Sequence, residues 1–333
     1  MKVNIIAEAG VNHNGNIVKA KKLALEAKKI GADYVKYQIF NPDEIAIHNL
    51  KKTVYQKKNT RGDSDNQYDM LKKLSLTHKD FDKLIKYCKK INIKFLASVF
   101  DISSFDYLKK KSRIIKIGSS EISNFFLLKE IAKYNKNLII STGMCNFAVI
   151  KKALNLLYKN GQDKNKITLL HCNSAYPTPL SDANILTMNR LKDTFKVSVG
   201  YSDHTLGKDA VYAAVALGAN IIEKHFTLNK NLKGPDHKIS LDVGEFEEMV
   251  NGIRNITKTL NIKKGKLTKS EKENAALVKK FLVAKNYIKK GEKFSLENLT
   301  AKRTGGGIDS MKINTILNKK SKKFFLKNKL IKI

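Results

Sequence analysis

Two histidines stand at the ends of consecutive apolar runs, and their types and spacing suit shared chemistry. His204 follows the run 197–203 (VSVGYSD), and His225 lies within the run 221–227 (IIEKHFT). If both runs are neighbouring strands of one parallel sheet, their carboxyl ends lie side by side. Imidazoles are common ligands of divalent metals, and two protein ligands leave positions open for substrate. The sequence therefore predicts a metal site at His204 and His225; two unrelated histidines, each hydrogen-bonded to a neighbour, are the alternative.

Two lysines interrupt other apolar runs, where an ammonium is rarely buried without a partner. Lys36 and Lys116 could bind phosphate or carboxylate, or form a Schiff base. Hydroxyl groups expected at the same height belong to Ser98, Ser119, Ser141 and Ser202. Together these groups predict a cradle for a phosphorylated anion. The alternative is a structural ion pair of a lysine with Glu8 or Glu121.

Two loop motifs could complete a substrate site. Tyr176 begins Tyr-Pro-Thr-Pro, a stiff loop that could hold a ring near the site, and Asp236 in Gly-Pro-Asp-His could bind a sugar hydroxyl. The chain has neither a Gly-x-Gly-x-x-Gly fingerprint nor a P-loop, which disfavours nucleotide cofactors.

The elements that must position these residues are eight apolar runs rich in β-branched residues. The runs are 3–10, 34–40, 94–100, 114–120, 137–143, 167–173, 197–203 and 221–227. Each is long enough for a buried parallel strand, and most start 20 to 31 residues apart, which leaves room for a helix. This pattern predicts an α/β protein with a (β/α)8 TIM barrel, whose chemistry sits at the carboxyl ends of the strands.

The intervals between the runs predict how the barrel is covered. Asn16 can cap a first helix that Gly31 ends. Residues 41–67 are polar and predict a long loop over the barrel mouth, followed by one helix over 67–91.

The pattern changes near residue 260. We expect a catalytic barrel over 1–260, a polar linker over 261–275 and a small unit of short strands and turns over 276–333. A unit of this size is marginal alone and is expected to lean on a neighbour.

Composition and charge indicate which kinds of binding partner the protein is expected to have. Among 333 residues the formal charge is +34, but only five of the 64 basic residues are arginine. Scattered lysines without arginine forks or aromatic platforms do not predict nucleic-acid binding. No apolar run approaches the roughly 20 residues that span a bilayer, so no membrane partner is expected. Three cysteines without paired spacing suit a reduced, cytoplasmic setting.

Nine motifs in register resemble the sialic acid synthase family, which includes the N-acetylneuraminate, legionaminic and pseudaminic acid synthases. They are AEAGVNHNG (7–15), VKYQIF (35–40), YQKKNT (55–60), KIGSSE (116–121), STGM (141–144), HCNSAYPTP (171–179), GYSDHT (200–205), EKHFTL (223–228) and GPDH (234–237). Members condense phosphoenolpyruvate with an N-acylated amino sugar. The stretch 288–308 resembles the antifreeze-like (SAF, β-clip) domain that ends these enzymes.

The resemblance implies Mn²⁺ or Mg²⁺ at His204 and His225, which we expect to be catalytic. Glu8 and Glu121 are candidates to orient the sugar and water or to transfer protons. It implies a phosphoenolpyruvate cradle of Lys36, Ser98, Lys116, Ser119, Ser141, Ser174 and Ser202. It implies sugar contacts from Gln38, Glu121, Tyr176 and Asp236. It also implies a domain-swapped homodimer in which Arg303 reaches the partner's site. Val99, Ser120 and Thr304 depart from the family pattern.

The favoured expectation is an N-acetylneuraminate synthase that uses N-acetylmannosamine, phosphoenolpyruvate and water, with cleavage of the phosphoenolpyruvate C–O bond. Legionaminate or pseudaminate synthesis by the same chemistry is the near alternative. A Schiff-base barrel aldolase and a polyanion-binding protein are the distant ones.

Overall fold

The computed structural model describes residues 2–60, 62, 64–260 and 265–332. The chain divides into two compact units, 1–261 and 262–333, and each is described here by itself.

The first unit is a closed barrel of eight parallel strands in sequential order, with β8 paired to β1. Its strands are β1 (Asn4–Gly10), β2 (Tyr34–Ile39), β3 (Lys94–Val99), β4 (Ile114–Ile117), β5 (Asn137–Ser141), β6 (Ile167–His171), β7 (Ser198–Asp203) and β8 (Ile221–His225). Every strand falls within one of the eight apolar runs, so the predicted TIM barrel is confirmed.

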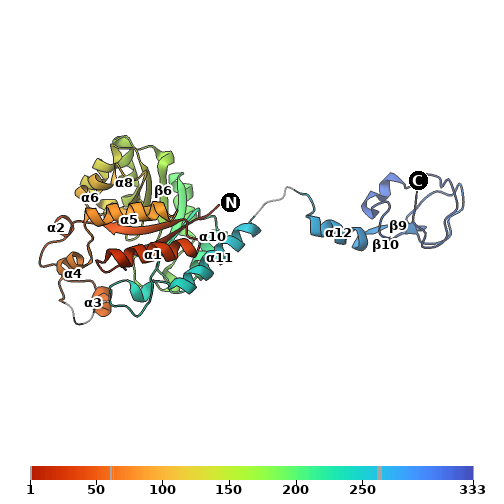
Figure 1. The fold of residues 1–333 in the computed structure, drawn as a ribbon. Coiled ribbons are helices and arrows are strands. Elements are labelled where there is room, and N and C mark those ends of the chain that lie inside the picture. Colours follow the sequence, from red (N-terminus) through yellow and green to blue (C-terminus); the bar gives the residue numbers. More distant parts are fainter. Residues whose placement is uncertain (1, 61, 63, 261–264, 333) are drawn as a thin grey trace. The chain divides into compact units, whose positions relative to one another are not determined.

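Seven helices between the strands and one helix after β8 cover the outside of the barrel in the described part of the chain, as Figure 1 shows for α1, α5 and α11. They are α1 (Ile17–Lys29), α5 (His78–Lys90), α6 (Ile102–Leu108), α7 (Phe125–Ala132), α8 (Phe147–Lys159), α9 (Thr187–Phe195), α10 (Asp209–Ala216) and α11 (Val243–Thr259). The predicted cap is present: the Asn16 side chain accepts hydrogen bonds from the backbone N–H groups of Val18 and Lys19. Gly31 follows α1 with φ +80°, a conformation that favours glycine.

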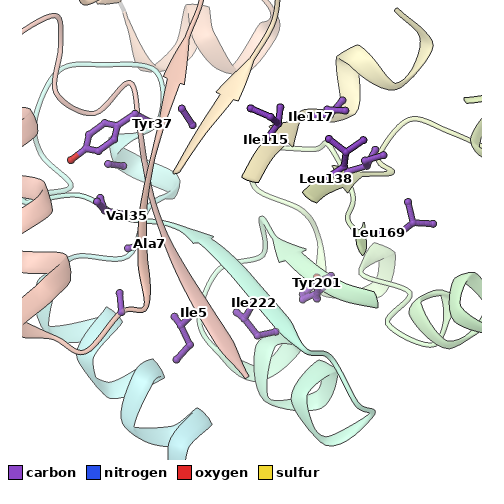
Figure 2. Packing of buried hydrophobic residues seen from close by; sticks show 14 of the residues in the cluster. Ile5, Ala7, Val35, Tyr37, Ile115, Ile117, Leu138, Leu169, Tyr201 and Ile222 are labelled. Carbon is purple, nitrogen blue, oxygen red and sulfur yellow. The ribbon is translucent and has the colours of Figure 1, made fainter. Parts of the chain in front are cut away.

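The strands bury different side chains on their two faces because side chains alternate along a strand. Outward-facing residues such as Ile5, Val35, Tyr37 and Ile222 pack in the main core with residues of the helices (Figure 2). Inside the barrel a second apolar cluster forms a layer that we call the barrel floor, made of Ile6, Leu96, Ile139, Leu170 and Ile221. The next inward position towards the carboxyl end is polar on four of these strands: Glu8, Ser98, Ser141 and Glu223.

The long connection between β2 and β3 differs from the sequence prediction in two ways. It contains two short helices, α2 (Pro42–Ile45) and α3 (Val54–Asn59), where a loop was expected, and two helices, α4 (Gln67–Leu74) and α5, where one helix over 67–91 was expected. The single helix is wrong because the chain is extended at Ser75 and Thr77, and the Thr77 hydroxyl caps α5 by accepting from the Asp80 N–H at 3.2 Å.

The second unit contains α12 (Lys269–Val278) and an antiparallel pair, β9 (Lys280–Ala284) and β10 (Leu299–Arg303). Its own small core is built from Leu282, Ala284, Ile288, Phe294, Leu299, Ile316, Phe325 and Ile331. Part of the expected linker therefore forms α12, and its first residues, 261–264, lie outside the described part of the chain. Across the described residues, none of the helices is long and apolar enough to cross a bilayer.

Candidate active site

Lys36 is the centre of a buried polar layer directly above the barrel floor. Its Nζ lies 2.8 Å from Glu8 Oε2 and 3.6 Å from Glu223 Oε2, and it donates a hydrogen bond to Ser98 Oγ at 3.0 Å. Gln38 Nε2 donates to Glu8 Oε1 at 3.4 Å. The lysine side chain is only 4% exposed. The Lys36–Glu8 ion pair that the sequence left as an alternative is thus present, and it lies among the residues expected to bind substrate.

Lys116 belongs to the same layer and lies near the other carboxylate oxygen of Glu223. Its Nζ donates to Ser141 Oγ at 2.7 Å and lies 3.8 Å from Glu223 Oε1. Ser202 Oγ donates to the same Glu223 oxygen at 3.0 Å. Glu223 therefore bridges both lysines, although the sequence analysis gave it no role. The sequence did contain a signal for such a role. Glu223 precedes His225 by two residues and therefore lies on the same face of β8.

Burial and the neighbouring charges shift the pKa values of the two carboxyl groups, Glu8 and Glu223, in opposite directions. Burial raises the pKa of Glu8. Burial also opposes ionisation of Glu223, but the ammonium groups of Lys116 and Lys36 outweigh it and lower the pKa of Glu223. Two carboxyl groups whose pKa values differ in this way suit different tasks. Glu8 can exchange a proton, while Glu223 stays ionised.

A second group of hydroxyls surrounds the N–H of Gly143, after β5. That N–H donates to Ser119 Oγ at 3.0 Å, and Ser119 Oγ lies 3.2 Å from Cys172 Sγ. A Cβ at position 143 would come within 2.3 Å of Ser174 Oγ and 2.9 Å of Ser119 Oγ. Only glycine therefore lets the backbone approach these predicted anion contacts. The structure adds Cys172 to the group.

His204 and His225 lie together at the ends of β7 and β8, with ring centroids 5.5 Å apart. His204 Nδ1 donates to the Asn173 carbonyl at 2.6 Å, which leaves Nε2 with a free lone pair. His225 Nδ1 is buried and has no hydrogen-bond partner among the described residues. Burial lowers the pKa of both imidazoles and so favours the neutral form that a metal ligand requires.

These properties fit a divalent metal held by two imidazoles. Within the described ranges, no group of three or more His, Cys, Asp or Glu residues is arranged to hold a metal ion. Any further ligands at this site would have to come from other groups, substrate or solvent.

An aromatic stack flanks the histidines. The ring of Tyr176 lies 4.3 Å from that of His204, centroid to centroid, and stacks on Tyr55 at 5.0 Å. Tyr55 belongs to α3, and Asn59 at the end of this helix donates to the Pro235 carbonyl at 2.6 Å. The long connection is thereby tied to the segment that carries Asp236.

Asp236 is buried close to the polar layer. Burial and the negative charge of Glu8 raise the pKa of Asp236 to about 7. Its carboxyl group can therefore be protonated or ionised near neutral pH.

Glu121 and Arg303 complete the set of expected site residues. Glu121 is half-buried in the 3₁₀ turn Ser119–Ser123 and accepts a hydrogen bond from Asn124 Nδ2 at 2.8 Å. Arg303 is exposed at the end of β10 in the second unit. Of the two candidate acid–base carboxylates, the structure thus places Glu8 against the lysines and pairs Glu121 with an amide.

Comparison with known proteins identifies the class that this fold and site define. The NeuB family profile matches residues 23–265. The chain is 48% identical to the N,N'-diacetyllegionaminic acid synthase of Campylobacter jejuni subsp. jejuni serotype O:2, with 99% of each chain covered. It is 40% identical to the enzyme of the same name from Legionella pneumophila, covering 94% of this chain and 88% of the relative.

A solved structure agrees with this assignment. The N-acetylneuraminic acid synthetase of Leptospira borgpetersenii serovar Hardjo-bovis, in complex with citrate, superimposes with a TM-score of 0.71 at 32% identity, covering 82% of this chain and 90% of that chain. The chain therefore belongs to the NeuB family. It is an enzyme of the kind that makes nonulosonic acids.

Proposed function

We propose that the protein condenses phosphoenolpyruvate with an N-acylated amino sugar to give N,N'-diacetyllegionaminate and phosphate. Identities of 48% and 40% to synthases of that name support this product. Phosphoenolpyruvate contains no nitrogen, so both acetamido groups must come from the sugar. The observation that carries the proposal is the buried layer of two lysines and hydroxyls beside the paired imidazoles of His204 and His225.

N-Acetylneuraminate, the product that the sequence analysis favoured, is the second candidate. The specific observation in its favour is the 32% identity to the Leptospira N-acetylneuraminic acid synthetase. The two reactions share one chemistry and differ only in the sugar.

The polar layer would bind phosphoenolpyruvate. Lys36 and Lys116 supply positive charge for its phosphate and carboxylate, and such charge-assisted contacts are strongest in a buried site. The serines of the layer and those around Gly143 can donate hydrogen bonds to the same oxygens. These are Ser98, Ser119, Ser141, Ser174 and Ser202.

His204 and His225 would hold Mn²⁺ or Mg²⁺. A divalent ion here would act as a Lewis acid on the aldehyde oxygen of the open-chain sugar. The C3 carbon of phosphoenolpyruvate forms the new bond to that aldehyde carbon, and water adds at C2. The C2–O bond to phosphate then breaks, which leaves a ketone. Water gives up a proton and the new hydroxyl gains one, and Glu8 is placed to carry it.

Tyr176, Gln38 and Asp236 would contact the sugar, with Tyr55 stacked behind Tyr176. We assign the second unit to the antifreeze-like (SAF) domain and propose that its Arg303 completes the sugar site of a partner subunit in a domain-swapped homodimer. A marginal core of eight buried apolar residues supports this, since so small a unit gains from a neighbour.

The test is phosphate release from phosphoenolpyruvate with each candidate sugar, before and after metal removal by EDTA. We expect turnover with the doubly acetamidated sugar, loss on chelation and recovery with Mn²⁺. His204→Ala and His225→Ala should each lose bound metal and turnover together. Full activity in protein shown to be metal-free would refute the metal role, and borohydride trapping of a pyruvate adduct would instead indicate a Schiff-base aldolase.

A further inference from the structure

A second buried ion pair lies immediately beside the two histidines in the sequence, on the other face of the same strands. Asp203 precedes His204, and Lys224 precedes His225. The Lys224 ammonium contacts Asp203 Oδ2, and the two side chains are only 1% and 0% exposed. The polar layer inside the barrel does not include this pair.

Strand alternation places the pair outside the barrel wall. Ser202 and Glu223 face inwards, where Ser202 Oγ donates to the Glu223 carboxylate. The residues that follow them, Asp203 and Lys224, therefore face outwards, as do Tyr201 and Ile222 of the main core (Figure 2). Asp203 and Lys224 are also direct partners in the register of β7 and β8. The ion pair thus joins the ends of the two strands from behind the histidines.

Further hydrogen bonds hold the pair, and their partners belong to the same strand ends. Asp203 accepts from Tyr201 Oη at 3.1 Å, from the Thr205 N–H at 2.9 Å and from Thr205 Oγ1 at 3.2 Å. Lys224 also donates to the Thr205 carbonyl at 2.8 Å. The residues on both sides of His204 are therefore tied to the residue that precedes His225.

Stability alone is a weak reason for such a pair. Desolvating two charges costs several kcal/mol for each ion, and well-packed apolar residues are often at least as stable in their place. Geometry is a stronger reason, because a metal site requires its ligands within about 0.5 Å of their productive positions.

We propose that the Asp203–Lys224 ion pair is a positioning device that sets the separation and orientation of His204 and His225 for a divalent cation. This inference rests on the metal site proposed above. The ion pair acts through the backbone of the strand ends, and neither side chain takes part in the reaction.

The experiment measures Mn²⁺ binding by calorimetry and electron paramagnetic resonance, and the visible absorption of the Co²⁺-loaded protein. The double variant Asp203→Asn/Lys224→Met removes both charges and leaves no unpaired ion, so it should fold. We expect its Kd for Mn²⁺ to rise about tenfold or more, as for other groups that orient metal ligands, and its Co²⁺ spectrum to change. The single variant Lys224→Met leaves Asp203 buried and unpaired, and it should lose thermal stability as well.

Arg254→Met is the matched control. Arg254 pairs with Asp33 at 2.7 Å and donates to the Val3 carbonyl at the amino-terminal end of the barrel. Its loss should lower the Tm and leave the Kd for Mn²⁺ unchanged. If Asp203→Asn/Lys224→Met keeps the wild-type Kd and Co²⁺ spectrum while His225→Ala abolishes binding, the positioning role is wrong and the metal site stands. If the wild-type protein shows no saturable Mn²⁺ binding, both are wrong.

Discussion

Lys36 and Lys116 lie in one layer of the barrel, but neighbouring carboxylates neutralise their positive charges to different degrees. Lys36 has a carboxylate oxygen at 2.8 Å, whereas the nearest carboxylate oxygen to Lys116 is 3.8 Å away. Glu223 and Glu8 raise the pKa of Lys36 against the opposing effect of burial, while burial lowers that of Lys116. The positive charge of Lys116 is thus the less neutralised of the two and the more available to an anionic substrate.

Replacing Lys116 should therefore affect one substrate more than the other. Loss of a charge-assisted hydrogen bond costs about 1.5–3 kcal/mol, so Lys116→Met should reduce kcat/KM for phosphoenolpyruvate roughly 10- to 150-fold. The KM for the sugar should change little. Steady-state kinetics with each substrate varied in turn check this, with Lys133→Met, at the exposed residue that follows α7, as the control. Equal losses for both substrates would indicate a structural role.

The carboxyl group of Asp236 predicts a pH dependence of stability. In the folded state the pKa of Asp236 is about 7, above the ordinary value of about 3.9. Between these two pH values the folded protein keeps a proton on Asp236 that the unfolded chain has already lost. Stability should fall as pH rises through this window, by up to about 1.4 kcal/mol per pH unit.

The variant Asp236→Asn has no proton to lose. Its free energy of unfolding should therefore increase relative to the wild type from pH 5 to pH 8, as measured by urea unfolding. Asp106→Asn, at an exposed ion pair on α6, is the control. Parallel pH profiles for Asp236→Asn and wild type would show that Asp236 is ionised throughout.

Several site residues were accessible from the sequence, and others were not. Lys36, Lys116 and the histidines stood out because polar groups interrupt apolar strands. Glu223, Asp203 and Lys224 are also charged residues within apolar strands. They were not predicted because the neighbouring histidines offered a more specific chemical signal. Tyr55 could not be found by this means, because its place beside Tyr176 depends on how a long connection folds.

At the scale of elements, the strands were the most predictable. Each strand is buried on both faces and must therefore be apolar along its length, and this property can be read from the residues of the run alone. The connection from β2 to β3 was not predictable to the same degree, because short polar helices depend on caps and tertiary contacts more than on periodicity. Thr77 illustrates this, since one capping hydroxyl divides a continuous helical pattern into α4 and α5.

This connection should influence binding of the sugar and not binding of phosphoenolpyruvate. An aromatic pair contributes about 0.5–1.5 kcal/mol beyond area burial, so Tyr55→Ala should raise the KM for the sugar roughly 2- to 12-fold by freeing Tyr176. The KM for phosphoenolpyruvate should stay unchanged. Tyr107→Ala removes a comparable stack with His78 outside the site and serves as the control. A larger effect on phosphoenolpyruvate than on the sugar would contradict the assignment.

At the scale of the whole molecule, the proposed domain swap leads to a complementation prediction. Arg303→Ala and His225→Ala should each be nearly inactive, and mixing the two should restore activity after subunit exchange. In a swapped dimer one hybrid site has both residues intact. If the second unit served its own barrel, every site would lack one residue and mixing would restore nothing. Exchange is verified beforehand by mass measurement of the mixed dimer, so a negative result counts against the swap.

The barrel floor has a consequence for the order of events in turnover. Among the described residues, Ile6, Leu96, Ile139, Leu170 and Ile221 form an apolar layer beneath the lysines, so we expect substrates to reach the polar layer through the mouth that the Tyr55–Tyr176 stack flanks. A sugar held at this stack would lie across the route to the lysines. Phosphoenolpyruvate should therefore enter first, and phosphate should leave only after the nine-carbon product. A non-reactive sugar analogue should then be uncompetitive against phosphoenolpyruvate, whereas random entry would make it noncompetitive.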